Sequence, residues 1–321
     1  MVRTEKLQDG IEIPVFPEGY VEDGRMSVWE LYQCFDRLEK EFDWIRETVY
    51  VQELPTLGGI LRFPIEVYRT PLWGRAFWVF AGIHGEEPAG PNALALNIEA
   101  LGELGKKIPV VVFPLCNPLG YFQDWRYPNE YRDKAKGHSV GDCEWLLPEL
   151  SSFPPRPRDP VWSCLEAFYL PGKIVELTRN YPPKISINHH EDLHHEAPYI
   201  YSQGKFGSKD PIALEVVKIL ILLECGLPID KRSRTDFGEP IVNGIVNNGH
   251  DSSIDELLVA DKVIVNGEVI QKAAAEHAIV VETPRPEFPL PSDMYPLEKR
   301  IEAHSKIILS YPRFWQMANN W

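Results

Sequence analysis

His84 and Glu87 are the first side chains in this 321-residue chain whose types and spacing could bind a metal ion. They lie in a short polar stretch directly after an apolar, strand-like run at 76–81. Because ligands of α/β proteins usually bind at the carboxyl ends of the strands, an imidazole and a carboxylate could converge there. Nitrogen and oxygen ligands suit zinc. The pattern His-x-x-Glu is weak by itself, and a carboxylate at a helix N-terminus beside a surface histidine is the alternative.

A histidine-rich segment at 189–196 contains the next candidates. It holds four of the nine histidines and follows a predicted strand at 184–188. His189 or His190, at the end of that strand, could complete a three-ligand site with the first pair. The other two histidines of the segment could support such a site or lie on the surface. The alternative is a solvated loop that binds metals only adventitiously.

Glu282 lies near the end of a third apolar run, at 278–283. A carboxylate that ends a buried strand is unfavourable without a partner, and a position beside a metal ion would supply one. There it could act as general base and acid, taking a proton from a water molecule and returning it to a leaving amine. The alternative is a salt-bridged glutamate at the edge of a sheet.

These candidates meet only if one sheet brings the three runs together. The apolar runs predict strands that are buried on both faces, and segments with helical periodicity alternate with them. The predicted strands are 60–68, 76–81, 108–115, 184–188, 197–202 and 278–283, and the predicted helices are 27–45, 88–104, 161–177, 211–225 and 297–309. This order predicts an α/β fold, with a mixed, mostly parallel twisted sheet and helices on both faces.

The chain is predicted to contain one main domain. A Ser-x-x-Glu capping box at 27–30 opens the first amphipathic helix. We place this helix in an N-terminal extension at 1–50 and assign 51–321 to a single catalytic domain. The proline-rich stretch at 130–160 predicts a long excursion over the surface, and loops of that length are uncommon unless they serve a site.

Composition excludes several classes of protein. The chain has 47 acidic residues against 33 Lys and Arg, a formal net charge of −14, which argues against a nucleic-acid partner. We find no apolar run long enough to cross a bilayer and no secretory signal, so no membrane partner is expected. The five cysteines are odd in number and scattered, which is typical of reduced thiols in a cytoplasmic protein. The oligomeric state is left open.

Several motifs together make the chain resemble the zinc carboxypeptidase superfamily, which includes the succinylglutamate desuccinylase and aspartoacylase branch. The motifs are His84-x-x-Glu87, Asn117-Pro118-Leu119-Gly120 followed by Arg126, His190-Glu191-Asp192, and Glu282-Thr283-Pro284. The resemblance extends from about residue 76 to the final helix. It implies a mixed sheet flanked by helices, one zinc ion, and hydrolysis of an amide bond near a free carboxylate.

The resemblance also implies roles for single residues. The residues that match the zinc ligands are His84, Glu87 and His190. His189 is the fallback for the third ligand. Glu282 matches the general base and acid, and Arg126 matches the arginine that polarises the scissile carbonyl and stabilises the oxyanion. Asn117 and Arg126 are expected to contact the substrate.

Two departures from the family pattern concern the substrate. The Asn-Arg pair that clamps a terminal carboxylate in family exopeptidases is missing from 136–145, and Arg132 could replace it only with a shift in register. The flexible tyrosine of many carboxypeptidases has no counterpart between Tyr201 and Tyr295. We predict zinc-dependent hydrolysis of amide bonds in small peptides, in the manner of a metallocarboxypeptidase. The alternatives are deacylation of N-acyl amino acids and a non-catalytic metal-binding protein on the same scaffold.

Overall fold

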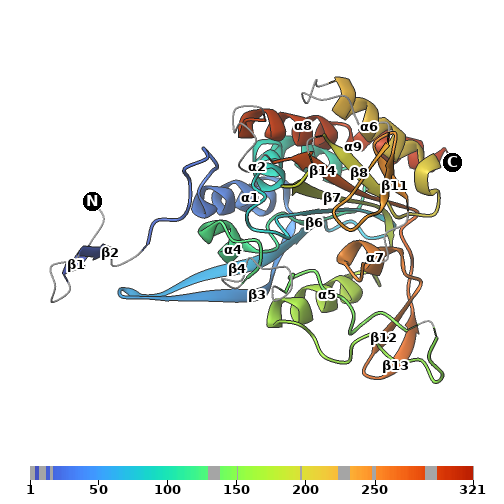
Figure 1. Ribbon diagram of the computed structural model, residues 1–321, viewed down its shortest axis with the longest axis horizontal. Coiled ribbons are helices and arrows are strands. Elements are labelled where there is room, and N and C mark those ends of the chain that lie inside the picture. Colours follow the sequence, from blue (N-terminus) through green and yellow to red (C-terminus); the bar gives the residue numbers. More distant parts are fainter. Residues whose placement is uncertain are drawn as a thin grey trace.

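One large sheet with helices on both faces dominates the computed structural model (Figure 1). The described residues are 4–6, 12–14, 17–128, 138–149, 151–195, 197–222, 232–247, 251–285 and 295–320. The described helices are α1 Val28–Phe42, α2 Ala89–Leu96, α3 Ile98–Gly105, α4 Pro118–Gln123, α5 Leu165–Leu177, α6 Pro211–Leu222, α7 Ile254–Val259, α8 Leu297–Leu309 and α9 Tyr311–Asn319, with a short 3₁₀ helix at Gly207–Lys209. The described strands are β1 Thr4–Lys6, β2 Glu12–Pro14, β3 Ile45–Thr56, β4 Gly59–Arg69, β5 Ala76–Ala81, β6 Val110–Phe113, β7 Pro183–Asp192, β8 Tyr199–Ser202, β9 Arg232–Arg234, β10 Pro240–Val242, β11 Ile245–Asn247, β12 Lys262–Val265, β13 Glu268–Gln271 and β14 His277–Pro284.

In the described part of the chain the main sheet has ten strands, in the order β3-β4-β6-β5-β7-β14-β8-β11-β10-β9. The four central strands β6, β5, β7 and β14 run parallel. β4 joins β6, and β8 joins β14, in the antiparallel direction. The predicted mixed sheet is therefore confirmed, with four parallel strands at its centre, antiparallel neighbours on both sides of them, and one further parallel pair, β8 with β11.

β5 shows how the sequence determines the two faces of the sheet. All six of its residues are buried, as its unbroken apolar run predicts. Successive side chains of a strand point to opposite faces. Phe77 and Val79 join the hydrophobic cluster that contains α1, α2, α3, α6, α8 and α9, whereas Trp78 and Phe80 join the cluster that contains α5 and α7. The helices predicted on both faces are thus confirmed.

The first helix is shorter than its apolar periodicity predicts. The capping box is present, since Ser27 accepts from the backbone N–H of Glu30 and the Glu30 side chain accepts from the backbone N–H of Ser27. Asp43, however, ends the helix in a left-handed conformation with a φ of 59°. Ile45, predicted as the last apolar residue of the helix, instead begins β3. The first residue of β3 is apolar and happens to lie at the helical spacing from Phe42. The apolar pattern of α1 therefore continues past its end, which explains the wrong boundary.

Other predicted elements differ at their boundaries. The helix predicted at 88–104 is two helices, α2 and α3, which meet at Asn97. The helix predicted at 161–177 begins only at Leu165. The strand predicted at 184–188 extends to Asp192, so the candidate histidines lie within β7 rather than after it. Residues 223–225, predicted as the end of a helix, lie outside the described residues.

The proline-rich stretch predicted as a surface excursion contributes to the core. Its described parts, 138–149 and 151–160, form turns and bends and one isolated bridge between Pro148 and Pro157. Val140 and Leu146 are nonetheless almost completely buried, in the same cluster as α5 and α7. The stretch therefore covers one face of the sheet, which a count of its prolines and polar residues did not indicate.

The division of the chain at residue 50 falls inside β3. Residues on both sides of that point pair with β4, and α1 packs in the same hydrophobic cluster as α2 and α3. We therefore describe α1 and β3 together with the main sheet, while the division into an extension at 1–50 and a domain at 51–321 stays a prediction. Among the described helices, none has the length and apolar character needed to cross a bilayer.

Candidate metal centre and active site

His84 and Glu87 lie in the turn that joins β5 to α2. Gly82 leaves the strand with a φ of 64°, a left-handed conformation that glycine adopts without strain. The backbone N–H of Asn117 donates to the Gly82 carbonyl over 2.8 Å, and that of Gly85 donates to the Arg126 carbonyl over 3.3 Å. This turn places both candidate ligands beyond the carboxyl end of a central parallel strand.

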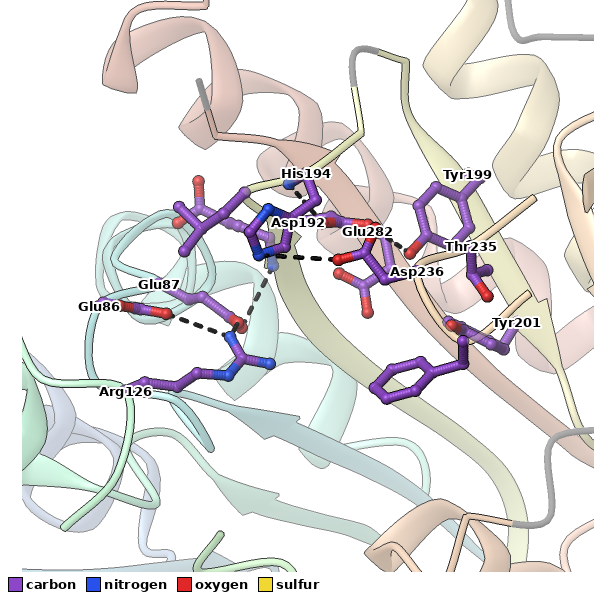
Figure 2. A pocket seen from close by; sticks show the side chains of 13 residues that line it. Glu86, Glu87, Arg126, Asp192, His194, Tyr199, Tyr201, Thr235, Asp236 and Glu282 are labelled. Carbon is purple, nitrogen blue, oxygen red and sulfur yellow. Dashed lines mark hydrogen bonds and ion pairs between the residues drawn. The ribbon is translucent and has the colours of Figure 1, made fainter. Parts of the chain in front are cut away.

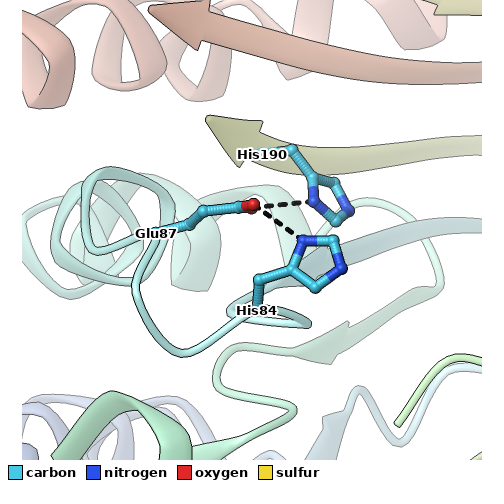
Figure 3. Close-up of side chains that lie close together, drawn as sticks. All are labelled: His84, Glu87 and His190. Atoms are coloured by element: carbon cyan, nitrogen blue, oxygen red, sulfur yellow. Dashed lines mark hydrogen bonds and ion pairs between the residues drawn. The ribbon is translucent and has the colours of Figure 1, made fainter. Parts of the chain in front are cut away.

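The third candidate, His190, comes from β7, the parallel neighbour of β5. Glu87 bridges the two histidines, with His84 Nδ1 2.7 Å from its Oε1 and His190 Nδ1 2.8 Å from its Oε2 (Figure 3). All three potential ligand atoms lie within 4.8 Å of one another. Glu87 is 1% exposed, and Figure 3 shows the two rings on the same side of its carboxylate. Two imidazole nitrogens and one carboxylate in this arrangement could hold a divalent metal ion.

The charges of this cluster are distributed unevenly. Burial lowers the pKa of both imidazoles, but for His190 the Glu87 carboxylate outweighs burial and raises the pKa to about 9. His84 is largely removed from solvent and also faces the Arg126 guanidinium, so its pKa falls to about 4. Although burial opposes ionisation of Glu87, the two imidazoles hold its pKa well below the usual range. At neutral pH the cluster then consists of a carboxylate, a protonated His190 and a neutral His84.

This distribution predicts that metal binding is linked to proton release. A histidine must lose its proton before that nitrogen can bind a metal. Since the pKa of His84 is about 4 and that of His190 about 9, zinc should displace close to one proton at pH 7. The zinc affinity should rise about tenfold per pH unit between these values. Calorimetric titration in buffers of different ionisation enthalpy measures this number, and release of no proton at pH 7 would contradict the assignment.

His189, the fallback for the third ligand, makes its hydrogen bonds away from the candidate metal site. Its side chain is fully buried, with Nδ1 2.8 Å from Nδ1 of His304 and Nε2 2.6 Å from the hydroxyl of Tyr311. The Nε2 atom of His304 is in turn 3.0 Å from Thr283 Oγ1. Adjacent residues of a strand face opposite sides of the sheet, which explains why His190 joins the cluster and His189 does not.

Glu282 reaches the same place from β14. This strand runs parallel to β7, with Glu282 opposite His190 in the register. Glu282 lines a cavity together with Glu87 and Arg126 (Figure 2). Burial and the nearby carboxylates of Glu87 and Asp192 raise its pKa well above the usual value, although His190 and Arg126 oppose this shift. A raised pKa makes a carboxyl group a stronger base when it is ionised, which suits a group that accepts and then returns a proton.

Arg126 follows α4 and lies on the other side of the cluster. Its Nη1 is 2.9 Å from Glu87 Oε1 and 3.2 Å from Glu86 Oε1. These ion pairs raise its pKa against the effect of burial. Its Nε is buried and has no hydrogen-bond partner within the described part of the chain. Arg126 therefore brings a fixed positive charge, and a donor that is still unused, to the wall of the cavity.

The contacts with substrate predicted for Asn117 and Arg132 both stay predictions. Asn117 is fully buried and is not among the residues that line the cavity, and its contact with substrate stays a prediction. Its Oδ1 accepts from the backbone of Gly120 and from Gln52, and its Nδ2 donates to the Arg126 carbonyl over 3.4 Å. Asparagine is a favoured N-cap residue, which gives Asn117 a structural role at the start of α4. Arg132 lies outside the described residues.

The cavity has a volume of about 230 Å³ and a wall that the sequence did not predict. Its lining residues are Glu86, Glu87, Arg126, Glu191, Asp192, Leu193, His194, Tyr199, Tyr201, Thr235, Asp236, Phe237 and Glu282. Figure 2 shows Tyr199 and Tyr201 on the side opposite Arg126. The Tyr199 hydroxyl donates to Asp192 Oδ2 over 2.6 Å. Alternation places the two tyrosines on one face of a predicted strand, but neither this pattern nor anything in the segment at 235–237 indicated that they line the cavity.

The ligand turn depends on a close backbone contact at Gly85. A Cβ atom added there would lie 2.0 Å from the carbonyl carbon of Gly120 and 2.2 Å from the backbone nitrogen of Tyr121. We expect Gly85→Ala to destabilise the protein by roughly 1–3 kcal/mol, since overpacking displaces backbone, and to weaken metal binding. Gly172→Ala is the control, because its nearest neighbour would be 3.9 Å away within α5. Urea unfolding of both variants tests this, and wild-type stability of Gly85→Ala would contradict it.

Known proteins resemble this chain in structure but not in sequence. The sequence matches no protein-family profile and no curated protein. A proposed metallopeptidase from Shewanella baltica OS155 has 17% identity and a TM-score of 0.67, over 99% of this chain and 98% of that one. A proposed metallopeptidase from Shewanella amazonensis SB2B has 19% identity and a TM-score of 0.66, with the same coverage.

A second group of solved structures is more distant. A metallo-carboxypeptidase from Burkholderia cenocepacia matches with 10% identity and a TM-score of 0.54, over 89% of this chain and 68% of that one. At such identities the likeness concerns the arrangement of helices and strands, and function must be argued from the site. The chain therefore shares its fold with these metallopeptidases and with the metallo-carboxypeptidase.

Proposed function

We propose that this protein is a zinc-dependent hydrolase of amide bonds that acts on small peptides or N-acyl amino acids. One observation carries the proposal. His84, Glu87 and His190 converge within 4.8 Å, and Glu282 lies opposite His190 on the adjacent parallel strand, in a cavity open to small molecules. The fold that the chain shares with metallo-carboxypeptidases supports the same interpretation.

The donor set fits zinc better than the harder divalent cations. Magnesium and calcium prefer oxygen ligands, whereas two imidazoles and one carboxylate are a common ligand set of catalytic zinc, which keeps a position open for water or substrate. Zinc bound there would supply Lewis acidity, lowering the pKa of a water molecule and polarising the scissile carbonyl. Glu87 and both histidines would hold the ion, and the backbone N–H of Glu191, 3.2 Å from Glu87 Oε2, would orient the carboxylate.

Glu282 is proposed to move the proton. As a carboxylate it accepts a proton from the attacking water, and as a carboxylic acid it donates that proton to the nitrogen of the leaving amine. The raised pKa of Glu282 supports the second step, because it favours the protonated form that donates to the amine. Its position opposite His190 on the neighbouring strand supports a location close to the metal ligands.

Arg126 is proposed to bind the carbonyl oxygen of the substrate as negative charge develops on it. The unpartnered, buried Nε and the fixed positive charge support this role, since donors that are already oriented in a site with little water stabilise an oxyanion strongly. Arg132 stays a proposed contact for a carboxylate of the substrate. Arg126 itself is held in place through its backbone carbonyl, which accepts from Gly85 and Asn117.

A substrate panel tests the proposal. Protein stripped of metal with a chelator is assayed on dipeptides, longer peptides and N-acyl amino acids, before and after addition of one equivalent of Zn²⁺. We expect hydrolysis that requires the ion and reaches its full rate near one equivalent. Preference for peptides or for N-acyl amino acids identifies the substrate group. Stoichiometric zinc binding without hydrolysis of any member would favour a non-catalytic metal-binding protein.

A further inference from the structure

Asp124 lies where three segments of the proposed active site meet. It ends α4 in a left-handed conformation with a φ of 55°, two residues before Arg126. Its Oδ1 accepts from Arg25 Nη2 over 2.8 Å and from Arg285 Nη2 over 3.2 Å. One carboxylate oxygen thus joins a segment before α1 to a residue that follows β14.

The two arginines hold the backbone of the turn that carries the candidate ligands. Arg25 Nη1 donates to the Gly85 carbonyl over 3.4 Å, and Arg285 Nη1 donates to the Glu86 carbonyl. These two carbonyls belong to the residues between His84 and Glu87. The backbone N–H of Gly85 donates to the Arg126 carbonyl, so the other side of the same turn is fixed to the segment that follows Asp124.

The burial of Arg25 makes this arrangement costly to disrupt. Its side chain has no exposed surface, and its guanidinium lies over the ring of Tyr20 at 4.7 Å and over that of Tyr121 at 5.0 Å. Asp23 Oδ2 provides its other ion pair, at 2.6 Å. A buried charge that loses a partner destabilises its surroundings, so the Asp124 carboxylate restrains the position of Arg25.

Arg285 extends the same restraint to the general base. It follows Glu282 by three residues, and its backbone N–H donates to the Asp192 carbonyl over 2.8 Å. The end of β14 is therefore tied both to the end of β7 and, through the Arg285 side chain, to the ligand turn. The proposed metal ligands and the proposed base are held in one network of hydrogen bonds.

We propose that Asp124 is a positioning residue: through Arg25 and Arg285 it fixes the turn between His84 and Glu87 relative to Arg126 and Glu282. The inference rests on the proposed function for its catalytic consequence. It also gives the segment before α1 a role in the site, because Arg25 belongs to that segment. Asp124 does not line the cavity and is not itself a catalytic residue.

The test compares Asp124→Asn with Asp43→Asn in the full-length protein. Both residues end a helix in the left-handed conformation, which asparagine tolerates, but Asp43 is exposed and lies at the end of α1. Zinc affinity is measured by competition with a chelator, and amide hydrogen exchange is followed in the segment 83–88. We expect Asp124→Asn to weaken zinc binding by about 10- to 100-fold, as loss of supporting contacts does at metal sites, and to speed exchange. Asp43→Asn should change neither.

A second variant keeps the test decisive if Asp124→Asn folds poorly. Arg285→Met removes the same ion pair at a side chain that is 16% exposed, and it should weaken zinc binding and speed exchange in the same segment. In the double variant, the loss of zinc affinity should be smaller than the sum of the losses in the two single variants, because both substitutions break one network. Wild-type affinity and exchange in both single variants, or fully additive effects, would overturn the inference.

The outcome is separable from the proposed function. If the wild-type protein hydrolyses no amide but Asp124→Asn weakens zinc binding, the positioning role stands and the hydrolase proposal fails. If the wild-type protein hydrolyses amides and Asp124→Asn leaves zinc affinity, exchange and kcat unchanged, the hydrolase proposal stands and the positioning role fails. Loss in kcat with little change in KM is the kinetic result expected for misplaced catalytic groups.

Discussion

Glu282→Gln should lower kcat by about 10²- to 10⁴-fold, the range that a general base or acid contributes, while zinc still binds. Glutamine has nearly the shape of glutamate but cannot accept or deliver the proton. Glu282 is not among the three residues whose ligand atoms converge, so the metal content should stay at the wild-type level. Steady-state kinetics on the best substrate of the panel, together with zinc content, measures both quantities.

The control for this variant is Glu276→Gln. Glu276 immediately precedes β14 and is partly exposed, and its carboxylate pairs with Arg75 at 2.7 Å. An exposed ion pair of this kind contributes little to stability, so kcat should not change. A wild-type rate in Glu282→Gln with full zinc occupancy would exclude Glu282 as the base and would require another residue of the cavity in that role.

His190→Ala should abolish stoichiometric zinc binding and, with it, hydrolysis. The substitution removes one of three ligands and also one hydrogen-bond partner of the buried Glu87 carboxylate. The loss of zinc affinity should therefore exceed the roughly 10- to 100-fold that removal of a supporting residue costs. Equilibrium dialysis against buffered zinc measures the affinity directly.

His138→Ala is the matched control for the loss of an imidazole. His138 is exposed, and it is not one of the residues that converge at the candidate metal site. Zinc affinity and kcat should both equal those of the wild-type protein. Retained stoichiometric zinc in His190→Ala would place the metal elsewhere in the protein and would contradict the proposed ligand set.

The sequence predicted the central sheet best where local and tertiary preferences agree. The apolar run at 76–81 has the same first and last residues as β5. A strand buried on both faces shows no alternation of apolar and polar residues, so the run itself marks the strand. The helix predicted at 297–309 coincides with α8. By contrast, β3 was missed: much of it is only partly buried, and its first residue, Ile45, continues the periodicity of α1.

The candidate site was predictable to the extent that its residues lie at the ends of central strands. Parallel strands bring their carboxyl ends together, so His190 and Glu282 could be placed beside the turn at 82–88 from sequence alone. The wall formed by Tyr199 and Tyr201 could not, because it depends on the antiparallel pairing of β8 with β14. No local pattern encodes which distant strand is the partner.

Asn117 shows the limit of assigning roles from a motif. The motif is present, but the side chain serves the backbone around it, as N-cap of α4 and donor to the Arg126 carbonyl. Arg25 shows the converse, since no motif marked it, although its guanidinium reaches the ligand turn from a segment far away in the sequence. The role of each residue follows from its burial and its hydrogen-bond partners, and only the fold determines these.

X-ray diffraction from zinc-soaked crystals, recorded on both sides of the zinc absorption edge, shows directly which residues bind the metal. We expect one dominant anomalous peak at about 2.0–2.2 Å from His84 Nδ1, His190 Nδ1 and a carboxylate oxygen of Glu87, with Glu282 facing the open side. A dominant peak at any other group of residues, or no peak at this cluster at saturating zinc, would contradict this expectation.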